Sequence, residues 1–590
     1  MQGNNNLSLD EKSFDVLLTK RLLRYAKPYW KDLSIAAALL LLITVGEQIQ
    51  PLLIKSIIDG PVSHGDPKGI LPLAGLFMAT LVWVFALQTW QTIQTKGMGQ
   101  NIMLDMRDEL YTKIHAQPLR YFDKNPVGAL MTRVIYDVET LNQFFTAGVS
   151  AVFQDFFTLI VAGVILVHMD WRLGLVALSL LPFLGWATAL YRIRARKLFK
   201  ESRVIAASLN SALSENLSGV STIQLFGREK KNAQKFDGIN RSNLEILLKQ
   251  VTINAFFFPL AEILSAIAVG LALVYGGYRV VNGSLDVGVV VATTLYIQRF
   301  FEPLRDLSDK FSILQSTMAS SERIFALLDR KEEVVDPPNP VSLGTLKGEI
   351  EFKDVWFAYE DERWVLQGLN FKISPGERVA VVGPTGAGKT SLTNVLYRFY
   401  PLQKGQVLLD GIPIETLRRD EFRKKMSLVP QDPFLFSGSI LENLRLSDAR
   451  IPRERVEWAC RQTQAHHFIS ALPGSYDFEL REAGANLSTG QKQLLAFARA
   501  LIFDPAVLVL DEATASVDTQ TEREIQDALE VLLRGRSSLT VAHRLSTVMN
   551  SDRILVIKDG TLAEQGSHET LMKLNGIYRG LIELQFKAVA

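Results

Sequence analysis

The sequence has a single cysteine, Cys460, among its 590 residues. One thiol cannot form an internal disulfide framework or a cysteine-based metal site, so both are excluded. The chain also lacks an excess of either charge, because 64 Lys and Arg residues are balanced by 62 Asp and Glu residues. The composition therefore gives no sign of a nucleic-acid partner, whose binding surface would be basic.

An apolar segment that a signal peptidase could remove is missing from the first residues. Residues 1–12 are polar, so we expect no secretory signal there. With 590 residues, the chain is too long for one hydrophobic core, and two or more domains are expected.

Long apolar runs are present, and they lie almost entirely before residue 320. Six of them reach about 20 residues, the length that a helix needs to cross a bilayer. They are residues 33–57, 70–91, 145–169, 173–191, 253–275 and 287–311. Buried helices of a soluble protein do not explain six such runs in one half of the chain. We therefore predict an all-α transmembrane domain with six helices.

The connections between these runs differ in charge and in length. Basic residues gather before the first run and after the fourth, whereas residues 60–69 and 168–172 carry few. By the positive-inside rule, both termini are cytoplasmic, and we expect a multi-pass protein of the cell inner (plasma) membrane in contact with membrane lipids. Residues 96–141 and 192–250 are long and charged at helix-compatible spacing. We expect helices to continue past the membrane there, with 118–133 and 209–226 as docking stretches.

The C-terminal half contains a phosphate-binding loop. Residues 383–390 match G-x-x-x-x-G-K-[ST] in full: Gly383, Pro384, Thr385, Gly386, Ala387, Gly388, Lys389 and Thr390, followed by Ser391. The glycines let backbone N–H groups close around phosphate oxygens. Lys389 then reaches the β- and γ-phosphates, and the Thr390 hydroxyl is placed to bind Mg²⁺. An expected strand at 378–382 leads into this loop, which predicts an α/β P-loop domain.

An acidic pair, Asp511 and Glu512, follows the apolar stretch 507–510. An acid at the end of a strand can hold Mg²⁺, and a second acid can orient the attacking water. A Gly-rich turn and a chance acidic pair could explain either motif alone, but not both in this order. The sequence thus predicts that the chain binds ATP and Mg²⁺ and hydrolyses ATP.

A charged, Pro-rich segment at 330–340 separates the two halves. We predict a cytoplasmic N-terminal segment at 1–30, a transmembrane domain at 31–325, a linker at 326–346 and an ATP-binding domain at 347–590.

Further motifs in the ATP-binding half resemble those of ABC-transporter ATPases. Leu487, Ser488, Thr489, Gly490 and Gln491 are similar to the signature sequence of that family. Gln431 resembles its Q-loop residue, Ser516 and Asp518 its D-loop, and His543 its switch histidine. Tyr359 lies where the family stacks an aromatic ring on adenine. With six apolar runs before one such ATPase, the whole chain resembles the bacterial ABC exporter half-transporters of the multidrug and lipid-flippase type.

This resemblance implies ATP-driven export or flipping of a hydrophobic or amphipathic substrate (a drug, lipid or peptide) by a dimer. In the family, ATP lies between the phosphate loop of one subunit and the signature sequence of the other. Glu512 would then activate the water, and His543 would steady it together with the γ-phosphate. Gln431 would join Thr390 and Asp511 at Mg²⁺.

Two departures from the family pattern keep alternatives open. Thr489 stands where the third signature residue is usually glycine, and residues 479–484 follow the family only loosely. Such drift is more common where two different half-transporters pair, so a heterodimer stays open although a homodimer is favoured. An ATP-gated or regulatory membrane protein is the other alternative, which the presence of Glu512, His543 and Gln431 disfavours. Inside the predicted spans, Glu47, Asp155, Glu262 and Arg299 either line a polar path or pair between helices.

Overall fold

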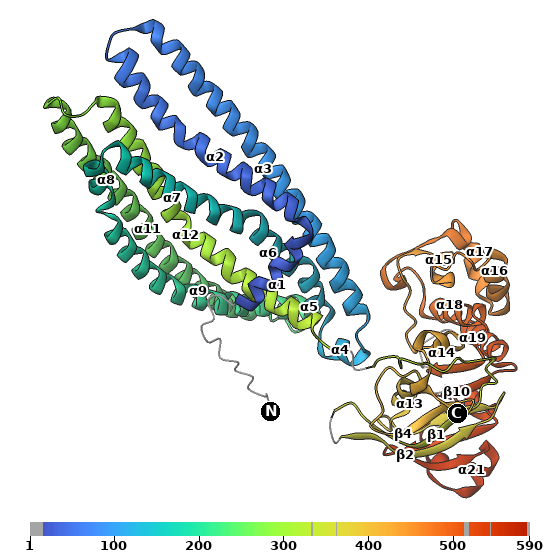
Figure 1. Ribbon diagram of the computed structural model, residues 1–590. Helices are drawn as coiled ribbons and strands as arrows, with labels where there is room; N and C mark the ends of the chain where they lie inside the picture. The colour runs from blue at the N-terminus through green and yellow to red at the C-terminus, as the bar shows by residue number, and fades with distance from the viewer. Residues whose placement is uncertain (1–15, 332–333, 361–362, 512–518, 543, 587–590) are drawn as a thin grey trace. The chain divides into compact units, whose positions relative to one another are not determined.

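The computed structural model describes residues 16–331, 334–360, 363–511, 519–542 and 544–586 (Figure 1). These residues form two compact units. The helical unit runs to His115 and continues over Val127–Arg330. The α/β unit combines the short segment Ala116–Pro126 with the chain from Lys331 onward. Residues 116–126 are therefore part of the α/β unit, although the rest of that unit comes from residues after 330.

Long helices make up the helical unit, and several of them exceed the thickness of a bilayer. Its α-helices are α1 (Val16–Ala26), α2 (Trp30–Ile57), α3 (Pro67–His115), α5 (Val127–Thr132), α6 (Val138–Gln143), α7 (Val149–Met169), α8 (Trp171–Leu178), α9 (Leu181–Ser218), α10 (Val220–Leu225), α11 (Glu229–Val281) and α12 (Val287–Leu328). Four short 3₁₀ or π segments join them: η1 (Lys27–Tyr29), η2 (Ile58–Val62), η3 (Arg133–Asp137) and η4 (Phe144–Gly148).

Five helical stretches of the described chain are long and apolar enough to cross a membrane. They are Leu17–Val62, Pro67–His115, Val127–Met169, Trp171–Ser218 and Glu229–Val281, and each contains one predicted span. Large apolar side chains on them are exposed; Phe85 of α3 is 70% exposed and Phe256 of α11 is 76% exposed. Such a surface suits a lipid environment, where apolar side chains need no protein cover.

The sixth predicted span, 287–311, lies in α12, which is not one of these five stretches. α12 is a single helix of 42 residues, so the predicted helix is present but is less apolar than expected. Ala292, Tyr296 and Phe301 of α12 are buried against other helices. A helix that is covered by its neighbours tolerates polar residues such as Arg299, because protein groups can satisfy them.

The described residues of the α/β unit form three sheets. Its strands are β1 (Ile350–Ala358), β2 (Trp364–Ile373), β3 (Arg378–Val382), β4 (Lys404–Leu409), β5 (Ile412–Pro413), β6 (Met426–Val429), β7 (Gly438–Ser439), β8 (Glu479–Leu480), β9 (Val507–Asp511), β10 (Ser537–Val541), β11 (Arg553–Lys558) and β12 (Thr561–Gly566). The antiparallel sheet has the order β2-β1-β4-β5, the largest sheet β12-β11-β3-β10-β9-β6, and the smallest pairs β7 with β8. In the largest sheet, β11, β3, β10, β9 and β6 are parallel, and only β12 is antiparallel.

Helices and short 3₁₀ turns complete this unit. They are α4 (Leu119–Lys124), α13 (Lys389–Leu396), η5 (Ile414–Thr416), α14 (Arg419–Lys424), α15 (Ile440–Arg445), α16 (Arg453–Gln462), α17 (Ala465–Ala471), η6 (Ser475–Asp477), η7 (Glu482–Gly484), α18 (Thr489–Ile502), α19 (Thr519–Leu533), α20 (Leu545–Met549), α21 (His568–Leu574) and α22 (Ile577–Phe586). A helical transmembrane part followed by an α/β domain is the predicted fold class, which is confirmed.

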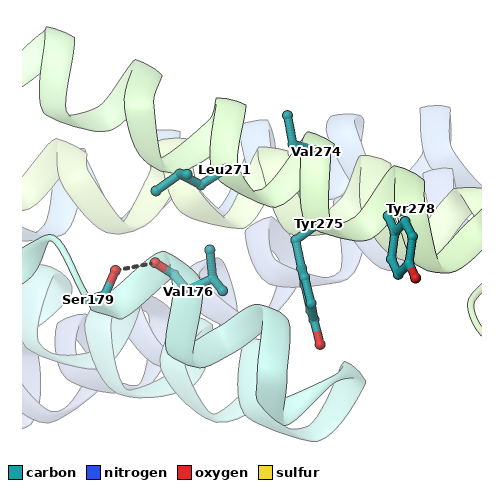
Figure 2. Close-up of a pocket in the computed structure, with 6 residues that line it drawn as sticks. All are labelled: Val176, Ser179, Leu271, Val274, Tyr275 and Tyr278. Atoms are coloured by element: carbon teal, nitrogen blue, oxygen red, sulfur yellow. Dashed lines mark hydrogen bonds between the residues drawn. The ribbon is translucent and has the colours of Figure 1, made fainter.

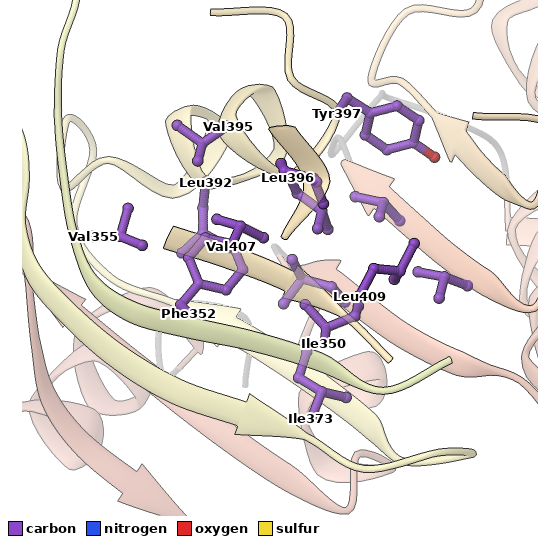
Figure 3. Packing of buried hydrophobic residues seen from close by; sticks show 14 of the residues in the cluster. Ile350, Phe352, Val355, Ile373, Leu392, Val395, Leu396, Tyr397, Val407 and Leu409 are labelled. Carbon is purple, nitrogen blue, oxygen red and sulfur yellow. The ribbon is translucent and has the colours of Figure 1, made fainter. Parts of the chain in front are cut away.

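Of the three hydrophobic cores in the described part of the α/β unit, two contain the helices α13 and α18, and the third contains Val382, Val556 and Tyr578. One core packs β1, β2 and β4 and the helix α13 against the largest sheet, with Phe352, Leu392 and Val407 at its centre (Figure 3). The other packs α18 against α15, α16, α17 and α19, and it contains Leu495 and the buried Cys460. Burial raises the pKa of the Cys460 thiol to about 12, so the thiol stays neutral and acts as a core residue.

Candidate active site

The phosphate loop joins β3 to α13 with a backbone that only glycine allows. Gly386 has φ 83° and Gly388 φ 100°, both in the left-handed region. A Cβ on Gly388 would lie 2.9 Å from the Val365 carbonyl oxygen, so a larger residue would also collide. The loop ends at the N-terminus of α13, where unpaired backbone N–H groups and the helix dipole favour an anion.

Lys389, the first residue of α13, is held beneath this loop. Its side chain is buried, and Nζ donates hydrogen bonds to the carbonyl oxygens of Gly383 (2.8 Å) and Pro384 (3.0 Å). Burial lowers the pKa of Lys389, whereas the charge of Asp511 opposes that shift. A phosphate group beside Nζ would favour the charged ammonium further, so the site is suited to an anionic ligand.

Two side-chain oxygens that could bind a metal ion meet next to the loop. Thr390 Oγ1 donates a hydrogen bond of 3.4 Å to Oδ2 of Asp511, which ends β9. A hydroxyl and a carboxylate are the hard oxygen ligands that Mg²⁺ prefers, so this pair fits the ion. No cluster of three or more His, Cys, Asp and Glu side chains occurs within the described ranges. ATP phosphates would supply further ligands to a Mg²⁺ ion at this place, as is usual for Mg²⁺ with nucleotides.

The parallel strands β3, β10, β9 and β6 end at one edge of the sheet, where the phosphate loop follows β3. Val541 of β10 is paired with both Val381 of β3 and Asp511 of β9, and β6 ends next to β9. Gln431, two residues after β6, is exposed at this edge. Glu512, Ser516, Asp518 and His543 lie outside the described residues, so their positions remain predictions.

Tyr359 follows β1 and is half-buried beside the phosphate-loop helix. Its hydroxyl is 3.0 Å from Ser391 Oγ and accepts a hydrogen bond of 2.9 Å from Asn394 Nδ2. Its ring packs edge-on against Phe357 and Tyr400. These contacts fix the ring next to α13, where the base of a nucleotide bound at the loop is expected.

The signature residues form the start of α18. Ser488 is the N-cap, and its Oγ accepts a hydrogen bond of 3.2 Å from the Gln491 backbone N–H, while Gln491 Oε1 accepts one from the Ser488 N–H (2.9 Å). Leu487 and Gly490 are buried, whereas Ser488 and Thr489 are exposed. The side chain of Thr489 therefore occupies the surface of the helix N-terminus and displaces nothing inside the chain.

Within one chain, the signature residues and the phosphate loop belong to different cores. α13 packs in the core of Figure 3, and α18 packs in the helical core. Among the residues that the structure describes, no hydrogen bond or ion pair joins 383–391 to 487–491. The exposed N-terminus of α18 is thus available to a group outside this chain's own phosphate loop.

Polar side chains also gather in the helical unit. Glu47 Oε1 of α2 accepts a hydrogen bond of 2.9 Å from Gln88 Nε2 of α3. Arg299 of α12 donates to the Glu47 backbone oxygen and to Gln50 Oε1 (2.7 Å). Three helices are therefore joined through one half-buried polar cluster inside the membrane part.

The other ionisable groups of the spans have separate environments. Asp155 of α7 forms an ion pair with Lys310 of α12, so its charge is balanced between helices. Glu262 is exposed on α11. Of the four ionisable residues, only Glu47 and Arg299 belong to a shared cluster.

A shallow apolar pocket lies elsewhere in the helical unit (Figure 2). It has a volume of about 490 Å³ and lies between the end of α8 and the C-terminal part of α11. Val176, Ser179, Leu271, Val274, Tyr275 and Tyr278 line it. Ser179 Oγ bonds to the Val176 carbonyl oxygen, so it offers no free donor to a ligand. The pocket is separate from the polar cluster of Glu47 and Arg299.

The sequence did not single out Asn394 or Tyr400, which hold Tyr359 in place. Asn394 lies four residues after Thr390 and therefore faces the same side of α13, a spacing that could have been noticed. Tyr400 is brought to Tyr359 by folding alone and carries no comparable sequence signal.

Comparisons with known proteins agree with these observations. The family model "ABC transporter transmembrane region" matches residues 33–304, and the model "ABC transporter" matches residues 366–515. The chain is 34% identical over 570 residues to the ATP-dependent lipid A-core flippase of Syntrophus aciditrophicus (strain SB), covering 96% of this chain and 94% of that protein. It is 36% identical over 523 residues to YheH of Bacillus subtilis (strain 168), named as a probable multidrug resistance ABC transporter ATP-binding/permease protein, covering 88% and 77%.

A solved structure shows the same similarity in three dimensions. The structure of a bacterial Atm1-family ABC exporter with ATP bound has a TM-score of 0.79 and 27% sequence identity, and the match covers 95% of this chain and 99% of that chain. The similarity therefore extends over both units.

Proposed function

The chain belongs to the ABC transporter family as an exporter with its transmembrane and ATPase domains in one polypeptide, and on this premise we propose which residues perform each step. Exporters of this type hydrolyse ATP to move a substrate across a membrane, and they work as dimers. The observation that carries the proposal is the meeting of Lys389, Thr390 and Asp511 beside the phosphate loop.

ATP binding is assigned to the loop and to Tyr359. The backbone N–H groups of the loop surround the phosphates, and Lys389 exchanges its carbonyl partners for the β- and γ-phosphate oxygens. Tyr359 stacks on adenine, with its hydroxyl fixed by Ser391 and Asn394. These contacts position the γ-phosphate at the sheet edge where β9 and β10 end.

Hydrolysis is assigned to residues at this edge. Thr390, Asp511 and Gln431 would hold Mg²⁺, which would neutralise charge on the phosphates. Glu512 accepts a proton from the attacking water, and His543 orients the water and the γ-phosphate. In the sequence, Glu512 follows Asp511 at the end of β9, and His543 comes two residues after Val541 at the end of β10; these two strands are paired in parallel.

The complete ATP site is assigned to two subunits. The exposed α18 N-terminus of one subunit, from Leu487 to Gln491, faces the γ-phosphate held by the loop of the other, where the helix dipole stabilises negative charge. Ser516 and Asp518 of the D-loop are assigned to the same interface. Because the chain carries every one of these residues, we favour a homodimer over a heterodimer.

The substrate is assigned to the amphipathic class. Relatives are named as a lipid A-core flippase and as a multidrug resistance transporter. In this chain, the cluster of Glu47, Gln88 and Arg299 offers a carboxylate, an amide and a guanidinium within an apolar helical unit. Such a site suits a molecule with a polar head and an apolar body. We also propose that both termini lie in the cytoplasm and that the helices cross the inner membrane.

The test is the ATPase activity of the chain purified alone. A homodimer with two complete sites is expected to hydrolyse ATP, with cross-linking or mass measurement showing two copies per particle. A chain that is inactive alone and gains turnover only with a second half-transporter would replace the homodimer with a heterodimer.

A further inference from the structure

The short helix α4 is bound to the α/β unit through a buried tyrosine. α4 lies between α3 and α5, which belong to the helical unit, yet its segment Ala116–Pro126 belongs to the α/β unit. Asp123 of α4 accepts a hydrogen bond of 2.5 Å from the hydroxyl of Tyr400. Burial, followed by this hydrogen bond, raises the pKa of Tyr400, so the phenol remains protonated and donates to the carboxylate.

Tyr400 in turn packs directly against the tyrosine proposed to stack on adenine. Its ring is 6% exposed and meets Tyr359 at 5.1 Å between centroids, with the planes at 89°. Phe357 contacts both rings, at 5.8 Å from Tyr400 and 4.8 Å from Tyr359. The two tyrosines therefore form an edge-to-face pair confined by a third ring, and neither can tilt without moving the other.

The opposite end of this series is the phosphate-loop helix. The Tyr359 hydroxyl is hydrogen-bonded to Ser391 and Asn394 of α13. One continuous set of contacts thus runs from Asp123 through Tyr400 and Tyr359 to the residue that follows Thr390. Each contact is a directional hydrogen bond or a packed ring pair. A shift of Asp123 is therefore expected to change the orientation of the Tyr359 ring.

We propose that Asp123 and Tyr400 are positioning residues that couple the docking of α4 to the binding of the adenine base by Tyr359. This inference rests on the proposed role of Tyr359. When α4 is docked, the hydrogen bond from Tyr400 to Asp123 fixes the orientation of the Tyr400 ring. That ring in turn keeps the Tyr359 ring in place for the base. Because such coupling is reciprocal, bound ATP also strengthens the docking of α4, which is covalently continuous with α3 and α5.

The experiment measures ATPase kinetics of the full-length dimer in lipid nanodiscs. Tyr400→Phe keeps the ring and removes the hydroxyl, and Asp123→Ala removes the acceptor. Each is expected to raise KM for ATP three- to tenfold while kcat at saturating ATP changes less than twofold. The double variant is expected to be no worse than the worse single variant, because both changes break the same bond. Asp123→Asn retains an acceptor oxygen and is expected to stay within twofold of the unmodified protein.

A matched control is present on α3, where Asp105 accepts a hydrogen bond of 2.8 Å from the Tyr29 hydroxyl. Asp105→Ala removes the same kind of bond within the helical unit and is expected to leave KM for ATP unchanged. A second readout is amide hydrogen exchange of residues 116–126. A non-hydrolysable ATP analogue is expected to slow this exchange in the unmodified protein and not in Tyr400→Phe.

Three outcomes would overturn the coupling. They are an unchanged KM in Asp123→Ala and Tyr400→Phe, effects that multiply in the double variant, or an equal rise in Asp105→Ala. Tyr359→Ala separates this failure from failure of the proposed ATP site. A raised KM in Tyr359→Ala beside an unchanged KM in Asp123→Ala refutes the coupling alone, whereas an unchanged KM in Tyr359→Ala refutes both.

Discussion

The ATP site and the polar cluster of the membrane part differ in what holds their charged residues. Lys389 is held by two carbonyl oxygens of a loop whose glycines fix its backbone, so its partners come from the main chain. Glu47 and Arg299 are held partly by the amides of Gln88 and Gln50, so their arrangement depends on other side chains. A site built on the main chain requires a fixed sequence motif, whereas a site built from side chains can be changed piece by piece. We propose that the first serves ATP and that the second, as the substrate site, can be adapted to different substrates.

The largest effect is expected from Lys389→Ala. This change removes the only charged side chain of the loop from the γ-phosphate, and loss of such a charge stabiliser lowers kcat by about 10²–10³-fold. Steady-state ATP hydrolysis by the purified dimer measures it, with Lys404→Ala as a surface control on β4. Activity within a few fold of the unmodified protein would show that the loop does not bind the reacting phosphate.

A smaller and selective effect is expected from Glu47→Gln. The change keeps the shape and the contact with Gln88 but removes the charge, so transport of a cationic amphiphile should fall by about tenfold relative to a neutral one. The factor of ten corresponds to one weakened charge contact of about 1.4 kcal/mol. Parallel flux measurements with two dyes of similar size test this. An equal change for both dyes would make Glu47 a structural residue.

The Asp155–Lys310 ion pair lies in the same helical unit as Glu47, and we expect it to affect stability rather than transport. Asp155→Asn leaves the ammonium of Lys310 without its carboxylate, and a hydrogen bond to a charged group is worth about 1.5–3 kcal/mol. The thermal unfolding midpoint is expected to fall, and Lys310→Met added to Asp155→Asn is expected to restore much of the loss. If the single variant is as stable as the unmodified protein and transport changes instead, the pair belongs to the substrate path.

The smallest effect is expected from Thr489→Gly, which restores the usual family residue. Thr489 is exposed at the first position of α18, and the Ser488–Gln491 capping bonds do not involve its side chain. The kcat for ATP is expected to change by less than about threefold, because only the helix propensity term of about 1 kcal/mol is altered and the caps remain. A rise of tenfold or more would show that Thr489 holds the signature away from the phosphate.

The sequence predicted the ATP half in more detail than the membrane half, because the ATP half depends on local sequence motifs. The phosphate loop and the Asp511 strand end are local patterns, so Lys389, Thr390 and Asp511 could be named before the fold was known. Apolar length likewise predicted the helices. Length could not show that α12 is covered by its neighbours, because burial depends on partners far along the chain.

Contacts between segments far apart in the chain could not be predicted from the sequence either. The stretch 118–133 was predicted to dock, but neither Asp123 nor Tyr400 was named, since 277 positions separate them. The pairing of Asp155 with Lys310 and the joining of Glu47 to Gln88 were open for the same reason. Each depends on which helix faces which, and periodicity alone does not fix that.

The central claim is that hydrolysis by this chain drives uphill export, and vesicle transport tests it most directly. The purified protein is reconstituted into proteoliposomes with a fluorescent amphiphile, and ATP is added on the side of the ATPase domain. The unmodified protein is expected to accumulate the amphiphile against its gradient, whereas Glu512→Gln binds ATP, hydrolyses almost none and accumulates none. Equal accumulation by Glu512→Gln, or only downhill movement by the unmodified protein, would contradict the claim.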